Sequence, residues 1–214
     1  MSGFDAASLR ASLAEGIKAL PLSVDDAQID QMIAYLALLS KWNSVYNLTS
    51  IRDPKEMVKQ HVLDSLSAAP AFKHAKNVLD VGAGGGLPGM ILAITYPAVR
   101  VSMIDTVSKK TAFLTQAKTE LGLKNVTVYT GRVEALAVTA KFDVITSRAF
   151  SELCNFINWS GHLLAEGGQF IAMKGVAPDQ EIERMPEGWQ VQSLQPLSVP
   201  GMDAERHLVF IQRQ

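Results

Sequence analysis

The chain has 214 residues, of which 48% are hydrophobic, and a formal net charge of −1 from 20 basic and 21 acidic residues. This composition excludes a disordered chain, and the length suits one α/β domain with a small addition. A nucleic-acid binder usually carries an overall basic footprint, so near-neutral charge counts mildly against an RNA substrate and restricts any RNA site to a local patch.

Cys154 is the only cysteine, which excludes an internal disulfide and a cysteine-based zinc site and fits a reducing cytoplasm. We expect no signal peptide, because residues 1–5 lack a basic segment followed by an apolar one. No apolar run approaches the length of a membrane span, so we expect no membrane partner.

Residues 1–70 are predicted to form a helical N-terminal region. Ser23 is expected to cap a helix whose apolar residues recur at helical spacing, namely Ile29, Met32, Ile33 and Leu36. Asp53-Pro54-Lys55-Glu56 predicts the start of another helix, with a capping aspartate, proline at the first position and glutamate three residues on.

From Asn77 the pattern changes to alternating strands and helices, which predicts a parallel sheet with helices on both faces. Strands are expected near 77–81, 101–105, 126–130, 142–147, 169–173, 189–194 and 207–212. Helices are expected near 88–95, 107–120 and 151–165. The chain is thus divided into a helical region over 1–70 and an α/β domain over 71–214.

A glycine-rich loop follows the first of these strands and suits a nucleotide cofactor. Gly82, Gly84 and Gly86 form a G-x-G-x-G pattern preceded by Asp80, while a second frame that ends at Gly89 matches the G-x-G-x-x-G dinucleotide fingerprint. The dinucleotide frame starts two residues late after the strand, and a carboxylate would repel a pyrophosphate. A carboxylate suits a cationic ligand, so the loop favours S-adenosylmethionine over NAD and resembles motif I of the class I methyltransferases.

Asp105 ends the next strand, 23 residues after Gly82, at the spacing of an acidic residue that accepts hydrogen bonds from ribose hydroxyls. It could instead cap the following helix. A ribose occurs in both NAD and S-adenosylmethionine, so Asp105 supports a nucleoside cofactor without choosing between them.

Two cations fall at the carboxyl ends of later strands, where ligands bind in this architecture. Arg148 follows the fourth strand and Lys174 the fifth. An unpaired charge in a cleft is costly, so each either contacts a ligand or pairs with Asp80, Asp105 or Glu134.

Several motifs together give a more specific indication. They are Tyr46-Asn47-Leu48-Thr49-Ser50, His61-Val62-Leu63-Asp64-Ser65-Leu66, the loop 80–89, Asp105-Thr106-Val107-Ser108-Lys109-Lys110, Arg132-Val133-Glu134, Ser147-Arg148-Ala149, Lys174-Gly175 and Glu205-Arg206-His207. With this set, nearly the whole chain resembles the bacterial small-subunit rRNA guanine-N7 methyltransferases, also called the glucose-inhibited division protein B family.

The resemblance implies a class I methyltransferase fold, Rossmann-like, with a seven-stranded mostly parallel sheet whose last strand is antiparallel. It implies methyl transfer from S-adenosylmethionine to N7 of a guanine (guanine 527 in the 530 loop) of 16S rRNA, free or in a small-subunit precursor. The cofactor-binding residues expected from the loop, from Asp105 and from the resemblance are Gly82, Gly84, Gly86, Leu87, Asp105, Val133, Glu134 and Arg148. The residues expected at the RNA are Asn47, His61, Arg148, Lys174 and Arg206.

The chemistry of this target predicts no general base and no metal. Guanine N7 carries an in-plane lone pair and no proton, so the enzyme mainly positions nucleophile and methyl group. His61 and Asp64, three residues apart, are interpreted as a hydrogen-bonded pair on one helix face. The Lys109–Lys110 pair is interpreted as a solvated first helical turn.

Other functions remain open at this point. A small-molecule methyltransferase on the same fold suits the near-neutral charge, and a basic concave rim would argue against it. A nicotinamide-dependent oxidoreductase fits the dinucleotide frame but not Asp80. A nucleotide-binding regulatory module would bind the ligand without methyl transfer.

Overall fold

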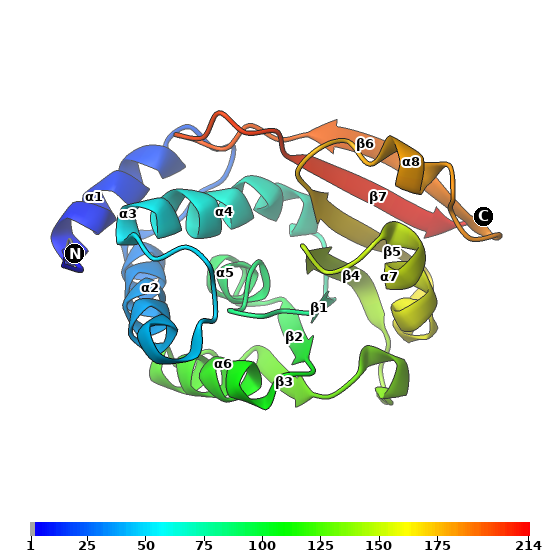
Figure 1. The fold of residues 1–214 in the computed structure, drawn as a ribbon, viewed down its shortest axis with the longest axis horizontal. Coiled ribbons are helices and arrows are strands. Elements are labelled where there is room, and N and C mark those ends of the chain that lie inside the picture. The colour runs from blue at the N-terminus through cyan, green and yellow to red at the C-terminus, as the bar shows by residue number, and fades with distance from the viewer. Residues whose placement is uncertain (1–2) are drawn as a thin grey trace.

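The computed structural model describes residues 3–214 and contains one seven-stranded sheet with the order β3-β2-β1-β4-β5-β7-β6 (Figure 1). The strands are β1 (Asn77–Val81), β2 (Arg100–Asp105), β3 (Val126–Thr130), β4 (Phe142–Arg148), β5 (Leu164–Lys174), β6 (Trp189–Pro196) and β7 (His207–Arg213). All seven predicted strands are present, so the α/β fold class is confirmed.

The first five strands run parallel, and β7 is antiparallel to both of its neighbours, β5 and β6. β1 lies between β2 and β4, with Asp80 beside Met103 on one side and Thr146 on the other. The carboxyl ends of β1, β2, β3 and β4 therefore meet at one edge of the sheet, where parallel α/β proteins bind their ligands.

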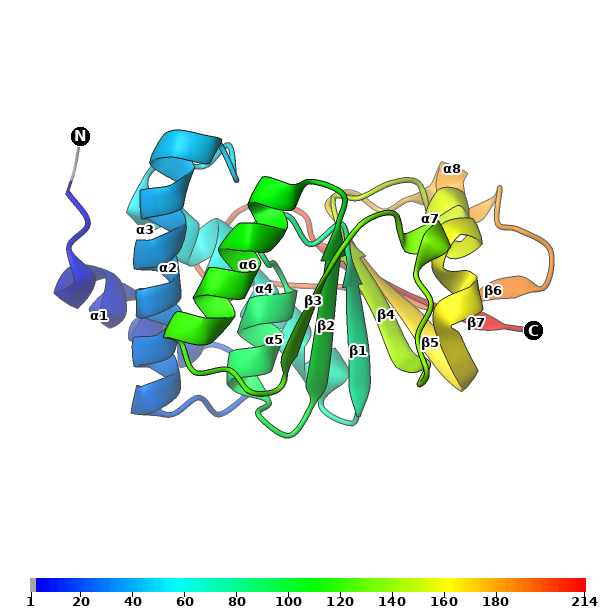
Figure 2. The same ribbon diagram turned by 90° about the horizontal axis from the view of Figure 1, so that it is seen from below.

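Helices cover the two faces of the sheet unequally (Figure 2). α5 (Gly89–Thr95) and α6 (Ser108–Glu120) lie on one face, with the N-terminal helices α1 (Ala6–Ile17) and α2 (Asp26–Tyr46) outside them. The other face carries α7 (Leu153–Ser160) and the short α8 (Asp179–Ile182). Residues 3–214 also contain three short 3-10 turns, at Ala69–Phe72 (η2), Val133–Ala135 (η3) and Gly161–Leu163 (η4).

The N-terminal helices begin at aspartates. Asp25 caps α2 and forms a reciprocal capping box with Gln28, so the prediction of Ser23 as the cap was wrong. Both residues precede the apolar repeat, but only Asp25 has a glutamine three residues on to complete the box. Asp53 caps the next helix as predicted, with Pro54 at its start, although Glu56 bonds to Lys59 and Gln60 instead of closing a box.

The helix that Asp53 caps contains a π-helical segment. α3 (Pro54–Met57) continues into η1 (Val58–Leu63), which has π-helical hydrogen bonding, and then into α4 (Asp64–Ala68). The extra residue per turn rotates the side chains that follow, and such bulges are frequent at functional sites. His61 lies within the segment and Asp64 follows it, and both are buried.

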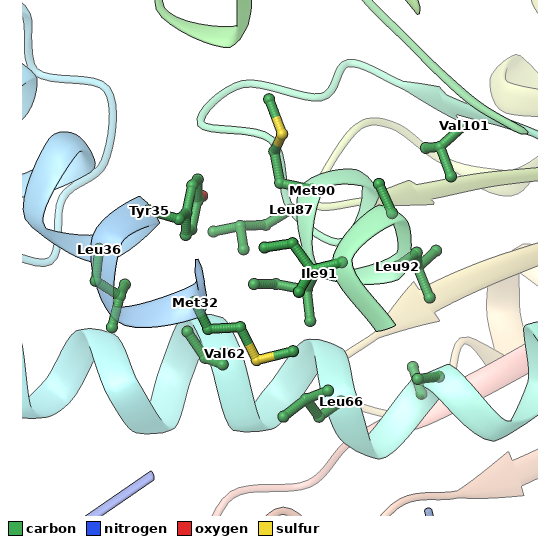
Figure 3. Packing of buried hydrophobic residues seen from close by; sticks show 14 of the residues in the cluster. Met32, Tyr35, Leu36, Val62, Leu66, Leu87, Met90, Ile91, Leu92 and Val101 are labelled. Atoms are coloured by element: carbon green, nitrogen blue, oxygen red, sulfur yellow. The ribbon is translucent and has the colours of Figure 1, made fainter. Parts of the chain in front are cut away.

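One apolar cluster joins the N-terminal helices to the α/β part of the chain. Figure 3 shows Met32 and Leu36 of α2, Leu66 of α4 and Ile91 of α5 converging between the three helices. The hydroxyl of the buried Tyr35 donates to the Gly85 carbonyl at 2.6 Å, so α2 also supports the glycine loop.

Candidate functional site

The glycine loop turns back over the end of β1 through three residues with positive φ, namely Gly82 (+68°), Gly84 (+57°) and Gly86 (+92°). The first of these angles is stabilised by hydrogen bonds from the Gly82 and Ala83 amides to the Ile104 carbonyl. A Cβ on Gly84 would meet only the Gly82 carbonyl oxygen, at an ordinary contact distance of 3.8 Å, whereas the ring of Phe150 fills the position that a Cβ on Gly82 would take. Gly84 therefore leaves room for a ligand.

Asp80 has a different role from the one expected. It is fully buried under the loop, where Oδ2 accepts from the Gly89 amide at 2.8 Å and Oδ1 has no partner among the described residues. Burial raises the pKa of its carboxyl to about 7. It lines neither cavity described below, so the expectation of a carboxylate facing a cationic ligand was wrong.

Asp105 links the loop to the second strand. Its Oδ2 accepts from the Gly84 amide at 3.0 Å and its Oδ1 from the Val107 amide at 2.9 Å, with Lys110 Nζ at 3.8 Å from Oδ2. The carboxylate therefore stabilises the glycine loop and the start of α6 together. Each oxygen retains a lone pair for a further donor.

A cavity of about 380 Å³ opens beside Asp105, and we call it the strand-side cavity. Its walls follow the ends of β1 to β4 and consist of Val81, Gly82, Ile104, Asp105, Thr106, Val107, Lys110, Gly131, Arg132, Val133, Glu134, Ala149, Phe150 and Trp159. Glu134 binds Arg132 at 2.8 Å, and this pairing lowers the pKa of the Glu134 carboxyl.

A second cavity of about 540 Å³ lies on the other side of the loop, and we call it the helix-side cavity. Its walls are Leu39, Leu48, Thr49, Ser50, Ile51, Gln60, His61, Asp64, Gly82, Ala83, Gly84, Gly85, Leu87, Arg148, Ala149, Met173, Lys174, Gly175, Leu197, Arg206 and His207. The two cavities share Gly82 and Ala149. They therefore adjoin where the walls carry the smallest side chains.

Asp64 binds two arginines in the wall of the helix-side cavity. Its Oδ2 accepts from Arg148 Nη1 at 2.9 Å and its Oδ1 from Arg206 Nε at 2.8 Å, while Asp64 itself is 1% exposed. Arg148 Nη1 also donates to the Gln60 carbonyl at 2.8 Å. Arg148 thus pairs with Asp64 and not with Asp80, Asp105 or Glu134, the partners considered from the sequence.

His61 lies beside this pair. Arg148 Nη2 is 3.4 Å from His61 Nδ1, and Thr49 Oγ1 is 2.9 Å from His61 Nε2. Burial and the Arg148 charge lower the pKa of His61 to about 4, so the ring is neutral near pH 7. The predicted His61–Asp64 hydrogen bond is absent among the described residues, because both side chains face Arg148 instead.

Lys174 is also paired. Its Nζ lies 2.9 and 2.8 Å from the two Glu181 carboxylate oxygens and donates to the Ser151 carbonyl at 3.0 Å. Glu181 belongs to α8, so the pairing joins the end of β5 to the face of the sheet that carries α7 and α8. None of the carboxylates considered from the sequence is its partner.

The other expected residues divide between the cavities and the surface. Gly82, Gly84 and Leu87 line the helix-side cavity, while Val133 and Glu134 line the strand-side cavity. Gly86 lines neither cavity, because it packs against Leu114 and Met90. Asn47 lies outside both as the C-cap of α2, with its side chain accepting from Arg52 at 2.6 Å. The Lys109 ammonium lies 5.3 Å from the centre of the Tyr46 ring.

Thr49 was missed as an individual residue, and Asp64 was considered only as a partner of His61, although both fall in motifs noted above. Asp64 occurs in an apolar helical segment, and a carboxylate in such a segment must find a cation. Thr49 follows an asparagine–leucine pair at the end of a helix, and nothing in that spacing indicates a contact with His61.

Among residues 3–214, no helix is long and apolar enough to cross a membrane. Nor do these residues contain a group of three or more His, Cys, Asp or Glu side chains that could hold a metal ion.

Comparisons with known proteins give a consistent result. The family model described as GidB, rRNA small subunit methyltransferase G, matches residues 28–209. A protein from Herminiimonas arsenicoxydans named ribosomal RNA small subunit methyltransferase G is 63% identical over 100% of both chains. A protein of the same name from Janthinobacterium sp. (strain Marseille) is 61% identical over 100% of this chain and 99% of the Janthinobacterium chain.

Solved structures share the fold at low sequence identity. The O-methyltransferase TomG from Streptomyces achromogenes, in complex with S-adenosylmethionine, aligns with a TM-score of 0.59 and 15% identity over 98% of this chain and 99% of its own. The glycopeptide N-methyltransferase MtfA, in complex with S-adenosylhomocysteine, aligns with a TM-score of 0.60 and 14% identity over 72% and 90%.

Proposed function

The chain belongs to the rRNA small subunit methyltransferase G family, and on that premise we propose that it transfers a methyl group from S-adenosylmethionine to N7 of a guanine in 16S rRNA. The single observation that carries this proposal within the structure is the junction of two cavities at Gly82 and Ala149. A cofactor in one cavity can present its methyl group to a base in the other.

The strand-side cavity suits the nucleoside half of the cofactor. Asp105 and Glu134 would accept hydrogen bonds from the ribose hydroxyls, and the buried Val133 would pack against the adenine. Gly84 leaves open the space that a side chain would fill, and Leu87 forms part of the wall beyond it. When bound, S-adenosylmethionine supplies an electrophilic methyl group on its sulfonium.

The helix-side cavity suits a reaction without proton abstraction. Asp64 is bound by two arginines, Lys174 by Glu181, and His61 is neutral between Arg148 and Thr49. These groups form ion pairs and hydrogen bonds with one another, so none of them is available as a general base. Guanine N7 needs none, because its lone pair is free. The residues of this cavity would hold the base in line with the methyl group.

The RNA itself would be held at the same edge of the sheet. Arg148, Lys174 and Arg206 retain N–H groups beyond those that their carboxylate partners occupy, and these can bind phosphates. We also propose that guanine 527 of the 530 loop is the target, that free 16S rRNA or a small-subunit precursor is the substrate, and that the protein acts in the cytoplasm. Residues 1–70 would form the outer wall against the RNA, and 71–214 would hold the cofactor.

The test is methylation of RNA in vitro. Small subunits and 16S rRNA from cells that lack this protein would be incubated with radiolabelled S-adenosylmethionine, and the nucleosides would then be separated. The expected product is 7-methylguanosine at one position. Label in another nucleoside, or transfer only to small molecules, would contradict the proposal, and binding of NAD without binding of the methyl donor would contradict the cofactor.

A further inference from the structure

Thr49 is fixed at the wall of the helix-side cavity by the buried Asn43. Asn43 Oδ1 accepts from the Thr49 amide at 2.9 Å, and its Nδ2 donates to the Ile51 carbonyl at 3.2 Å. The side-chain amide thus clamps the loop that follows α2 from both sides of Thr49. The backbone at Thr49 is therefore held in place before any substrate binds.

The contacts of His61 determine which of its nitrogens carries the proton. Arg148 is a hydrogen-bond donor only, and its Nη2 faces His61 Nδ1 at 3.4 Å, so Nδ1 must be the acceptor. In the neutral ring the proton then lies on Nε2, which faces Thr49 Oγ1 at 2.9 Å. His61 therefore donates to Thr49 instead of accepting from it.

Thr49 Oγ1 consequently accepts two hydrogen bonds, one from His61 Nε2 and one from the Ile51 amide at 3.2 Å. Its own hydroxyl hydrogen has no acceptor among residues 3–214. A hydroxyl that accepts two hydrogen bonds becomes a stronger donor. The cavity wall thus presents one oriented hydrogen-bond donor whose direction is set by its two neighbours.

We infer that the Thr49 hydroxyl donates a hydrogen bond to O6 of the target guanine and thereby selects guanine over adenine. The inference rests on the proposed function, because N7 and O6 share one edge of guanine. Adenine presents N7 beside an amino group on that edge, and an amino group cannot accept this bond. Thr49 is a positioning residue, and His61 and Asn43 act through it.

The wild-type protein provides the first test. RNA substrates would carry guanine, inosine or 2-aminopurine at the target position, and single-turnover rates would be compared. Inosine keeps N7 and O6 but lacks the 2-amino group, whereas 2-aminopurine keeps N7 and lacks O6. Inosine is expected to react at close to the guanine rate, and 2-aminopurine about tenfold more slowly, as the loss of one hydrogen bond predicts. Equal rates for guanine and 2-aminopurine would overturn the inference.

Variants then assign the effect to Thr49. Thr49→Val and Thr49→Ala should each lose about tenfold on guanine RNA but lose nothing further on 2-aminopurine RNA, because the same bond is missing in both. Thr49→Ser should retain the wild-type rate, and binding of the methyl donor measured by calorimetry should be unchanged in all three. If the loss caused by the substitution at Thr49 and the loss caused by 2-aminopurine multiply, Thr49 acts without O6.

The two proposals fail separately. If wild-type protein forms no 7-methylguanosine on guanine RNA, the proposed function is wrong. If the protein does form this product while the ratio of the rates on guanine and 2-aminopurine RNA is the same in wild type and in the Thr49 variants, only the role of Thr49 is wrong. The Ala and Val variants leave the Nε2 proton of His61 without its partner, so their folding would be checked by circular dichroism and compared with Thr49→Ser.

Discussion

Arg148 donates to Asp64 at 2.9 Å, although the two residues are 84 positions apart in the chain. Arg206 reaches the same carboxylate from a third segment. A helix of the N-terminal region, the end of β4 and the loop before β7 are therefore joined at one buried charge.

Substitution of Arg148 should destabilise the fold. Arg148→Ala leaves the buried Asp64 with one cation, and breaking such a pair is expected to lower the free energy of unfolding by about 2–4 kcal/mol. Urea denaturation measures the change. Lys18→Ala is the matched control, because the Lys18–Glu15 pair is exposed and should contribute little. Similar losses in the two variants would show that burial of Asp64 is not the cause.

Asp80 should make stability depend on pH. The pKa of its carboxyl is about 7 in the folded chain and near 3.8 when unfolded. Between these values the folded state holds a proton that the unfolded state releases, so stability falls as pH rises and levels off above the folded pKa. Asp80→Asn should remove this contribution. Urea midpoints at about pH 4.5 and about pH 7.5 test it, and an equal change in wild type and variant would contradict it.

Gly84→Val should abolish binding of the methyl donor while the fold survives. A β-branched residue at φ +57° is strained by roughly 1–2 kcal/mol or more, and its methyl groups would enter the space left for the ligand. Calorimetry measures binding. Gly122→Val is the control, since that glycine has φ +66°, open surroundings and a position away from both cavities. If Gly84→Val binds the methyl donor with wild-type affinity, the glycine loop is only a turn and does not contact the ligand.

Asp105→Ala should weaken donor binding by roughly 1–3 kcal/mol, because the ribose loses a charged acceptor and the Gly84 amide loses its partner. Asp143→Ala provides the comparison at the opposite end of the sheet. Asp143 also accepts from two backbone amides, those of Lys76 and Asn77. Both variants should lose stability, but only Asp105→Ala should lose affinity. Equal affinities would leave Asp105 as a structural residue that stabilises the loop and α6.

The chemical step should be nearly independent of pH. His61, with a pKa near 4, stays neutral from about pH 6 to about pH 9, and N7 of guanine carries no proton to remove. Single-turnover rates at saturating RNA and methyl donor measure this. Asp80→Asn is the control, because the buried Asp80 carboxyl titrates within this pH interval. A pH dependence that comes from Asp80 itself is absent from this variant. A rise of unit slope, removed by substitution of one cavity residue, would indicate proton abstraction and a different target atom.

The sequence predicted the sheet well because its strands are short apolar runs separated by glycine, proline and polar turns. β1 and β3 begin and end at the predicted residues. β5 is longer than predicted, at Leu164–Lys174, because it continues through the two glycines at 167 and 168, which local propensity treats as a break. The pattern indicated the strands but not the irregular pairing of β4 with β5.

The cations at the site were predicted, but their partners were not. Arg148 and Lys174 were expected at strand ends and line the helix-side cavity. Their partners, Asp64 and Glu181, come from helices whose approach depends on the packing of the whole chain. Asp80 shows the opposite error, because its place near the end of β1 was predicted while its burial under the loop was not. Spacing along one strand carries no information on what covers it.

The position of β7 has a consequence for synthesis of the chain. β6 is made before β7, yet β7 lies between β6 and the rest of the sheet. During translation β6 therefore has no sheet neighbour until the segment that contains residues 207–213 has left the ribosome, since domains fold as their parts emerge. Arg206, directly before β7, reaches Asp64 only at that stage. A nascent chain can thus complete the glycine loop well before it completes the helix-side cavity, so the proposed RNA site is the last part of the candidate site to form.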